Sequence, residues 1–212
     1  KMITRNKIGI IHYNSGNVGS LIKTVKKFSS DVIIVKNILD FNKCNKVILP
    51  GVGSFDIAID FLKKKKLLNK LKRFILDGGD ALGICLGMQI LYKSSEESKF
   101  SKGTGLIKKK IQKIKFENNV TVPHIGWNKI FINDCRENEF YKIIKNKKFY
   151  FSHSYADKIL KNKKNKAYFS YGKYHYNAII EYKNLLGLQF HPELSGKYAI
   201  KIFDLFINRK SS

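Results

Sequence analysis

Cysteine, negative charge and long apolar runs are scarce in this sequence, and each scarcity excludes a class of protein. The three cysteines, Cys44, Cys85 and Cys135, are odd in number and widely spaced, which argues against a disulfide framework, and no CxxC pair indicates a zinc site. No apolar run approaches the roughly 20 residues that cross a membrane. The apolar run at residues 7–13 is too short and too polar at its end for a signal peptide, so we expect a cytoplasmic protein.

Acidic residues are few beside basic ones. The chain has 41 lysines and arginines against 16 aspartates and glutamates, a formal net charge of +25. Such an excess can indicate a nucleic-acid-binding protein. The lysines, however, are spread along the whole chain, and no stacking motif or recognition-helix pattern accompanies them. We therefore expect solvated lysines and no specific nucleic-acid ligand, with attraction to an anionic ligand or an acidic partner as the alternative.

Short apolar strands alternate with helical patterns in the first half of the chain. Strands are predicted at residues 7–13, 31–36, 46–55 (which ends in a glycine-rich turn) and 81–85, and helices at 17–28, 56–77 and 86–93. This alternation predicts a parallel sheet covered on both faces. After residue 103 the pattern becomes β-rich, and a helix at 198–209 closes it. No linker or repeat divides the chain, so we predict one α/β domain over residues 1–212.

Cys85 stands in the segment GICLG, between a predicted strand and a predicted helix. A G-x-C-x-G turn in that context presents a nucleophile, as G-x-S-x-G does for serine. The small Gly83 and Gly87 permit a tight, strained turn, and a helix that begins beside the sulfur favours the thiolate. Taken alone, the segment fits an inert core cysteine equally well.

A thiolate nucleophile needs a base, a group that orients the base, and donors for the oxyanion. His191 and Glu193 follow an apolar strand and are two residues apart, so in an extended segment they point to the same side. The carboxylate would then hold the imidazole tautomer that accepts the thiol proton. The glycines of PGVGSF, residues 50–55, can expose backbone N–H groups to an oxyanion, although a PG pair also fits a simple turn.

These segments, with SEE at 95–97, VPHIGWN at 122–128 and FYFSHSYA at 149–156, resemble the class I glutamine amidotransferase family over nearly the whole chain. The resemblance implies that family's fold, an α/β architecture whose mostly parallel central sheet is flanked by helices, with a β-rich second half. It also implies hydrolysis of L-glutamine through a Cys85 thioester, with His191 as general acid and base and Glu193 as its orienter. The sequence has no metal-binding cluster and no dinucleotide fingerprint, so we expect neither metal nor cofactor. The other residues that the resemblance implies for substrate binding are Gly51, Val52, Gly53, Leu86, Gln89, Glu97, His153, Ser154 and Tyr155.

The segments VPHIGWN and FYFSHSYA are most similar to family members that form a heterodimer with a (β/α)8-barrel cyclase subunit and pass it ammonia for histidine biosynthesis. In that branch Asn17 and Trp127 resemble interface residues. Similar glutaminases supply an enzyme that amidates a nucleotide sugar for surface polysaccharide, and this pathway is the alternative. The chain departs from the family pattern at His12, Asn14 and Leu194. Leu194 stands where a lysine associated with the partner interface is usual.

Overall fold

The computed structural model describes residues 6–13, 18–29, 31–51, 53–115, 120–133, 139–159 and 167–209. Four residues singled out above, Asn14, Asn17, Val52 and Cys135, lie outside these ranges. Within them, no helix is long and apolar enough to cross a membrane.

A six-stranded sheet forms the centre of the molecule. The strand order is β13–β14–β4–β3–β1–β2, and every neighbouring pair is parallel except β13 with β14. The strands are β1 (Ile8–Ile11), β2 (Val32–Val35), β3 (Lys46–Leu49), β4 (Asp80–Ile84), β13 (Ile179–Tyr182) and β14 (Leu185–Leu188). The predicted fold class, a mostly parallel sheet flanked by helices, is confirmed.

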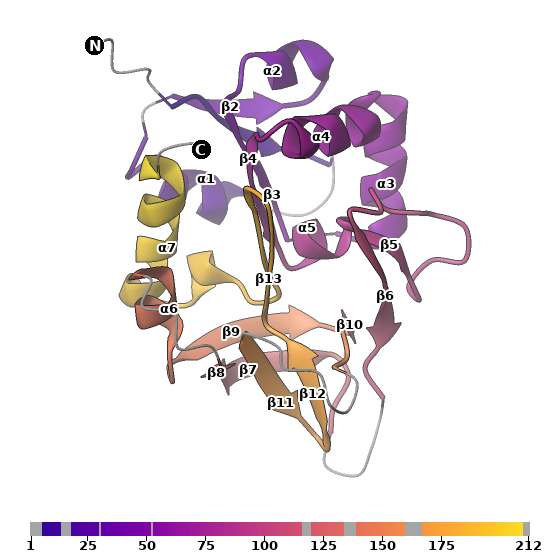
Figure 1. The fold of residues 1–212 in the computed structure, drawn as a ribbon, viewed down its shortest axis with the longest axis vertical. Helices are drawn as coiled ribbons and strands as arrows, with labels where there is room; N and C mark the ends of the chain where they lie inside the picture. The colour runs from indigo at the N-terminus through magenta and orange to yellow at the C-terminus, as the bar shows by residue number, and fades with distance from the viewer. Residues whose placement is uncertain are drawn as a thin grey trace.

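Both faces of this sheet are buried, because alternate side chains of each strand enter different cores. Ile48 and Leu82 pack with α1 (Gly19–Val25) and α7 (Lys197–Asn208). Val47 and Ala81, one residue along, pack with α2 (Ile38–Asn42), α3 (Phe55–Lys64) and α4 (Leu67–Leu76). Figure 1 shows α1 and α7 on one side of the sheet and α3 and α4 on the other. The continuous apolar runs in the sequence reflect this two-sided burial.

Three of the predicted helices were wrong in length, and the one predicted at 17–28 is the seven-residue α1 alone. The helix predicted at 56–77 is broken into α3 and α4 at Lys66, which has a left-handed backbone with a φ of 57°. The break occurs because the run of four lysines interrupts the apolar spacing. The turn there lets Leu62 and Leu67 both face the core. The helix predicted at 86–93 is α5 (Leu86–Gln89) alone, and β5 (Tyr92–Ser95) follows it because Tyr92 and Ser95 are buried in a pairing with β6.

The second half of the chain adds small sheets beyond one end of the central sheet (Figure 1), so the predicted β-rich half is confirmed. A hairpin-like pair joins β7 (His124–Lys129) to β9 (Lys148–His153). The remaining elements are β6 (Ile107–Lys113), β8 (Phe131–Ile132), α6 (Glu139–Ile144), β10 (Tyr155–Ala156), β11 (Ala167–Tyr171), β12 (Tyr174–Asn177) and the short 3-10 helix η1 (Pro192–Leu194).

Strand β14 comes late in the sequence but lies directly beside β4. The backbone N–H of Cys85, just after β4, donates to the carbonyl of Leu188 at 2.6 Å. Because the two strands are parallel, the residues that follow each of them meet at the same edge of the sheet. Cys85 and His191 are therefore brought to one place although about a hundred residues separate them.

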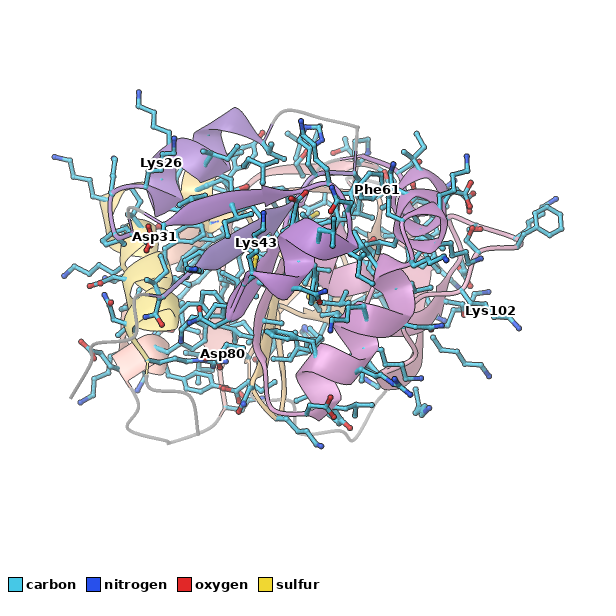
Figure 2. The ribbon with its side chains drawn as sticks, turned by 90° about the horizontal axis from the view of Figure 1, so that it is seen from above. Lys26, Asp31, Lys43, Phe61, Asp80 and Lys102 are labelled. Atoms are coloured by element: carbon cyan, nitrogen blue, oxygen red, sulfur yellow. The ribbon has the colours of Figure 1, made fainter. Side chains whose placement is uncertain are left out.

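A cluster of charged side chains is buried at the opposite end of the sheet, where β3 and β4 begin. The ammonium of Lys46 lies 2.8 Å from a carboxylate oxygen of Asp80 and also donates to the carbonyls of Phe206 and Arg209 at 3.3 and 2.7 Å. The Arg209 guanidinium pairs with the other Asp80 oxygen. The end of α7 is thereby joined to the starts of β3 and β4. In Figure 2 Asp80 lies toward the interior, whereas Lys26 and Lys102 lie on opposite sides of the molecule.

Replacing Asp80 with alanine is expected to lower the free energy of unfolding by about 3–5 kcal/mol, because Lys46 would keep its charge in the core without a counter-ion. Chemical denaturation followed by circular dichroism measures the loss. The control is Lys46→Met/Asp80→Leu, which removes the fully buried pair and is expected to recover most of the stability, because the partly exposed Arg209 guanidinium keeps its bond to the carbonyl of Asn184. An alanine variant as stable as the wild type would mean that the backbone carbonyls alone satisfy the Lys46 ammonium.

Candidate active site

Cys85 occupies a strained turn between β4 and α5. Its φ of 45° and ψ of −103° are rarely adopted by a residue with a side chain. Glycines make the turn possible, as the sequence predicted. A Cβ on Gly83 would lie 2.8 Å from the backbone of Gly87, and a Cβ on Gly87 would collide with the backbone of Leu49. Because α5 has only four residues, its dipole is weaker than that of the longer helix that was predicted.

His191 and Glu193 lie together at the edge of the sheet, on the turn that begins η1. Nδ1 of His191 is 2.9 Å from Oε1 of Glu193, and both side chains are buried. Burial by itself lowers the pKa of the imidazole, but the Cys85 sulfur and the Glu193 carboxylate together outweigh burial and raise that pKa to about 10. The ring is therefore an imidazolium at neutral pH, held between a sulfur and a carboxylate.

Ser195 fixes this turn to the neighbouring layer. Its hydroxyl donates to the carbonyl of His191 and accepts from the backbone N–H of Tyr150 at 2.9 Å. The backbone N–H of His191 donates to the carbonyl of Tyr150 at 2.9 Å. These three bonds hold the imidazole against β9. The sequence analysis did not single out Ser195.

Gly51 lies where the nucleophile and the imidazole meet. A Cβ built on Gly51 would be 2.7 Å from Cε1 of His191 and 2.9 Å from Cβ of Cys85. Both side chains therefore flank the same backbone position. The predicted catalytic residues are brought together, and the glycine-rich segment after β3 forms their wall.

A cavity of about 180 Å³ opens on the Cys85 side of this wall. It is lined by Cys85, by Ser152 and by eight of the residues predicted for substrate binding: Gly51, Gly53, Leu86, Gln89, Glu97, His153, Ser154 and Tyr155. The carboxylate of Glu97 accepts from the backbone N–H of Phe55 at 3.1 Å, and burial raises the pKa of this carboxyl. The cavity is thus lined by both the Cys85 sulfur and the Glu97 carboxylate.

His153 lines the cavity but is hydrogen-bonded away from Cys85. Its Nδ1 is 2.9 Å from the carbonyl of Tyr155, and its Nε2 is 3.2 Å from Nδ1 of His124. Burial lowers the pKa of His153 to about 3 and that of His124 to about 4. Both rings are therefore neutral at neutral pH, and the described hydrogen bonds of His153 lead to Tyr155 and His124 and not to the Cys85 sulfur. His124 was not predicted, because a histidine paired with another histidine has no signature in sequence.

A second cavity, of about 330 Å³, lies on the other side of His191. Gly51 and Ser152 border both cavities, while Tyr150, Glu193 and Leu194 border only this one. Trp127, predicted at an interface, is 53% exposed and packs edge-on against Tyr150. Leu194 is 47% exposed. Leu194 is therefore an exposed apolar residue at this cavity, and Trp127 lies next to the cavity through its contact with Tyr150.

Gln189 is a further residue that the sequence analysis missed. Its side chain is fully buried, and its Nε2 lies 3.6 Å from the Cys85 sulfur. The sequence offered only its position two residues before His191, and the expected extended segment from His191 to Glu193 is in fact interrupted by the 3-10 helix η1. Among the described residues, no three histidines, cysteines or acids are grouped to hold a metal ion.

Comparison with known proteins identifies the family of this chain. The family model for glutamine amidotransferase class-I matches residues 10–208. The chain belongs to the class I glutamine amidotransferase family. It is 40% identical over 202 residues to imidazole glycerol phosphate synthase subunit HisH of Prochlorococcus marinus subsp. pastoris, with 95% of this chain and 97% of the relative covered. The protein of the same name from Methanocaldococcus jannaschii is 40% identical over 206 residues, with 94% and 98% covered.

Solved structures agree on the fold alone. The structure of PurLQS from Thermotoga maritima matches with a TM-score of 0.69 at 16% identity, covering 97% of this chain and 99% of that chain. A crystal structure described as a glutamine amidotransferase matches with a TM-score of 0.66 at 13% identity, covering 95% and 98%.

Proposed function

We propose that this chain is the glutaminase subunit of imidazole glycerol phosphate synthase. The observation that carries the proposal is the meeting of Cys85, His191 and Glu193 beside a cavity of about 180 Å³. The HisH relatives, 40% identical over nearly the whole chain, favour the histidine pathway over the nucleotide-sugar alternative. Residues 1–212 would act as one domain in the cytoplasm.

In the proposed reaction, the Cys85 sulfur attacks the side-chain carbonyl carbon of L-glutamine, and a carbon–sulfur bond forms. The carbon–nitrogen bond then breaks, and the His191 imidazolium gives its proton to the leaving nitrogen, which departs as ammonia. Water next attacks the γ-glutamyl thioester. His191 takes the proton of this water, and glutamate leaves as the bond to sulfur breaks. Glu193 stabilises the imidazolium and fixes its orientation throughout.

The residues that line the cavity can bind the α-amino and α-carboxylate end of glutamine. Glu97 supplies a carboxylate for the α-ammonium group of glutamine, and Gln89 supplies an amide beside it. The backbones of His153, Ser154 and Tyr155 would line the same part of the pocket. The N–H of Leu86 would donate to the oxyanion, and the Gly51–Gly53 segment would turn to add a second donor when a partner binds.

The partner would be a (β/α)8-barrel cyclase subunit that uses the ammonia on the ribulosyl formimino-carboxamide nucleotide PRFAR, giving imidazole glycerol phosphate and AICAR. We place its contact at the second cavity and Trp127, with Asn17 as a further interface residue. Free ammonia is mostly protonated at neutral pH and is then no nucleophile, so release into a closed interface would keep it reactive. The apolar Leu194 at this face predicts an apolar contact where relatives with lysine would form an ion pair.

The test is glutamate release from L-glutamine by the purified chain, alone, with the cyclase subunit, and with the subunit plus PRFAR. We expect slow release alone and strong stimulation by the last mixture. Ammonium chloride in place of glutamine is the control, because the cyclase then needs no glutaminase. If PRFAR did not change the rate of glutamine hydrolysis, the chain would be assigned to the nucleotide-sugar pathway instead. No turnover by a folded complex would refute the glutaminase.

A further inference from the structure

The backbone carbonyl of Tyr155 determines how several side chains around Cys85 are oriented. A carbonyl oxygen can only accept hydrogen bonds. This one accepts from Nδ1 of His153 at 2.9 Å and from Nε2 of Gln89 at 2.9 Å. The amide of Gln89 must therefore present its NH₂ group to Tyr155.

The orientation of Gln89 sets the orientation of Gln189. Nε2 of Gln89 is 3.4 Å from Oε1 of Gln189, which accepts its second N–H. With the oxygen of Gln189 committed to Gln89, its NH₂ group must face the other way. On that side lies the sulfur of Cys85, 3.6 Å from Nε2 of Gln189. If the side-chain amide of Gln189 were rotated by 180°, its NH₂ group would face the NH₂ group of Gln89. The hydrogen bonds of Gln189 to Gln89 and to the Cys85 sulfur would then both be lost.

We propose that Gln189 is a further catalytic residue of this glutaminase, whose side-chain amide donates a hydrogen bond to the Cys85 sulfur and stabilises the negative charge on it. The inference rests on the proposed function, since it assigns the donor a role in glutamine hydrolysis. The sulfur is negatively charged before attack and again when the thioester is cleaved. Gln189 is fully buried, so water does not compete for its N–H.

The neutral thiol of Cys85 has a different hydrogen-bond partner from the thiolate. The carbonyl of Ser152 is 3.7 Å from the Cys85 sulfur and accepts from a neutral thiol. Gln189, which donates, favours the thiolate instead. The other titratable groups around the sulfur are His191 and Glu193 on the η1 turn, His153 on β9, and Glu97 and Tyr155 in the cavity. Of these, His191 takes the thiol proton, and the Gln189 amide stabilises the anion left behind.

Burial also distinguishes Gln189 from an ordinary packing residue. A primary amide costs free energy in the core unless its donors and acceptor are paired, and an aliphatic side chain would fill the position without that cost. The backbone of Gln189 is already held by the carbonyl of Ala178 at 2.9 Å. The side chain is therefore not needed to fix the strand, and its two bonds lead only to Gln89 and the sulfur.

The test uses Gln189→Met, which keeps the length of the side chain and removes the donor. The full chain is treated with iodoacetamide across pH, and mass spectrometry follows alkylation of the peptide that contains Cys85. We expect the midpoint of the alkylation profile to move upward by about one pH unit, and kcat to fall about 10- to 100-fold, with KM changed little. Gln112→Met, on the exposed face of β6, is the control and is expected to leave both measurements unchanged.

The second variant, Gln189→Glu, keeps the shape of glutamine and places oxygens on both sides, so a larger shift in the same direction is expected. If either folded variant kept the wild-type alkylation profile and lost only melting temperature, Gln189 would be a packing residue and the inference would be overturned. A shifted profile in a chain whose wild type never hydrolyses glutamine would support the hydrogen bond but refute its assignment to a glutaminase.

Discussion

Replacement of Cys85 by alanine is expected to abolish glutamine hydrolysis, with a fall in kcat of at least about 10⁴-fold, because no other group in the cavity can form the thioester. Cys44 cannot substitute. It lies beside Gly9 in the sheet and donates to the carbonyl of Asp40 at 3.3 Å, and burial raises the pKa of its thiol to about 11. Glutamate release by the complex measures the loss.

A stability measurement separates the chemical role of Cys85 from the strain of its turn. Alanine retains the unfavourable φ of 45°, whereas glycine adopts it freely. We expect Cys85→Gly to be about 1 kcal/mol more stable than Cys85→Ala and equally inactive. Measurable turnover in either variant would remove Cys85 from the reaction. Equal stability would mean that the turn carries no strain.

Replacement of Gly51 by alanine is expected to lower kcat/KM by about 10³-fold, although a single methyl group is added. The backbone of Gly51 is not in the left-handed region, so alanine meets no torsional penalty there. The new Cβ would instead lie 2.9 Å from the carbonyl oxygen of Ile84 and within 3 Å of both Cys85 and His191. The imidazole has to move away from the sulfur, and misplacement by about 1 Å costs roughly 10²-fold before the weakened proton transfer is counted.

Gly105→Ala is the matched control for Gly51→Ala. Gly105 has a φ of 67°, so alanine is strained there, but a Cβ meets nothing within 4 Å and the residue borders neither cavity. We expect this control to lose some stability and to keep its activity. Steady-state kinetics and thermal melting of both variants make the comparison. Full activity in Gly51→Ala would contradict the placement of Cys85 and His191 on either side of this glycine.

The sequence predicted the strands that precede Cys85 and His191 better than it predicted the helices around them. Cys85 and His191 each follow a buried parallel strand, and the residues after such strands gather at one edge of a sheet. That β14 lies next to β4 could not be read from the chain, because strand order depends on long-range packing. The break at Lys66 was missed because apolar residues on both sides of the four lysines suggested one continuous helical face, although the lysine run itself interrupts the apolar spacing. Gln189 was missed because an amide becomes a donor to sulfur only through its neighbours in space.

The resemblance to a family supplied what residue types alone could not. Spacing placed Glu193 beside His191, but the assignment of Gln89 and Glu97 to one pocket came from the family motifs. The structure brings these residues and Cys85 to the same cavity. Val52 and Asn17 lie outside the described residues, so their roles stay predictions.

The position of β14 between β4 and β13 also determines when the active site can form. The N–H of Cys85 is held by Leu188, and the side chain of Asn6 donates to the carbonyl of Ile207 at 2.7 Å. Contacts of such high sequence separation form late, after most of the loop entropy between them has been lost. On the ribosome, residues 81–92 leave the exit tunnel long before their partner strand is synthesised. We therefore expect Cys85 to reach the strained turn of the folded protein only after β14, the last strand of the central sheet, has paired with β4.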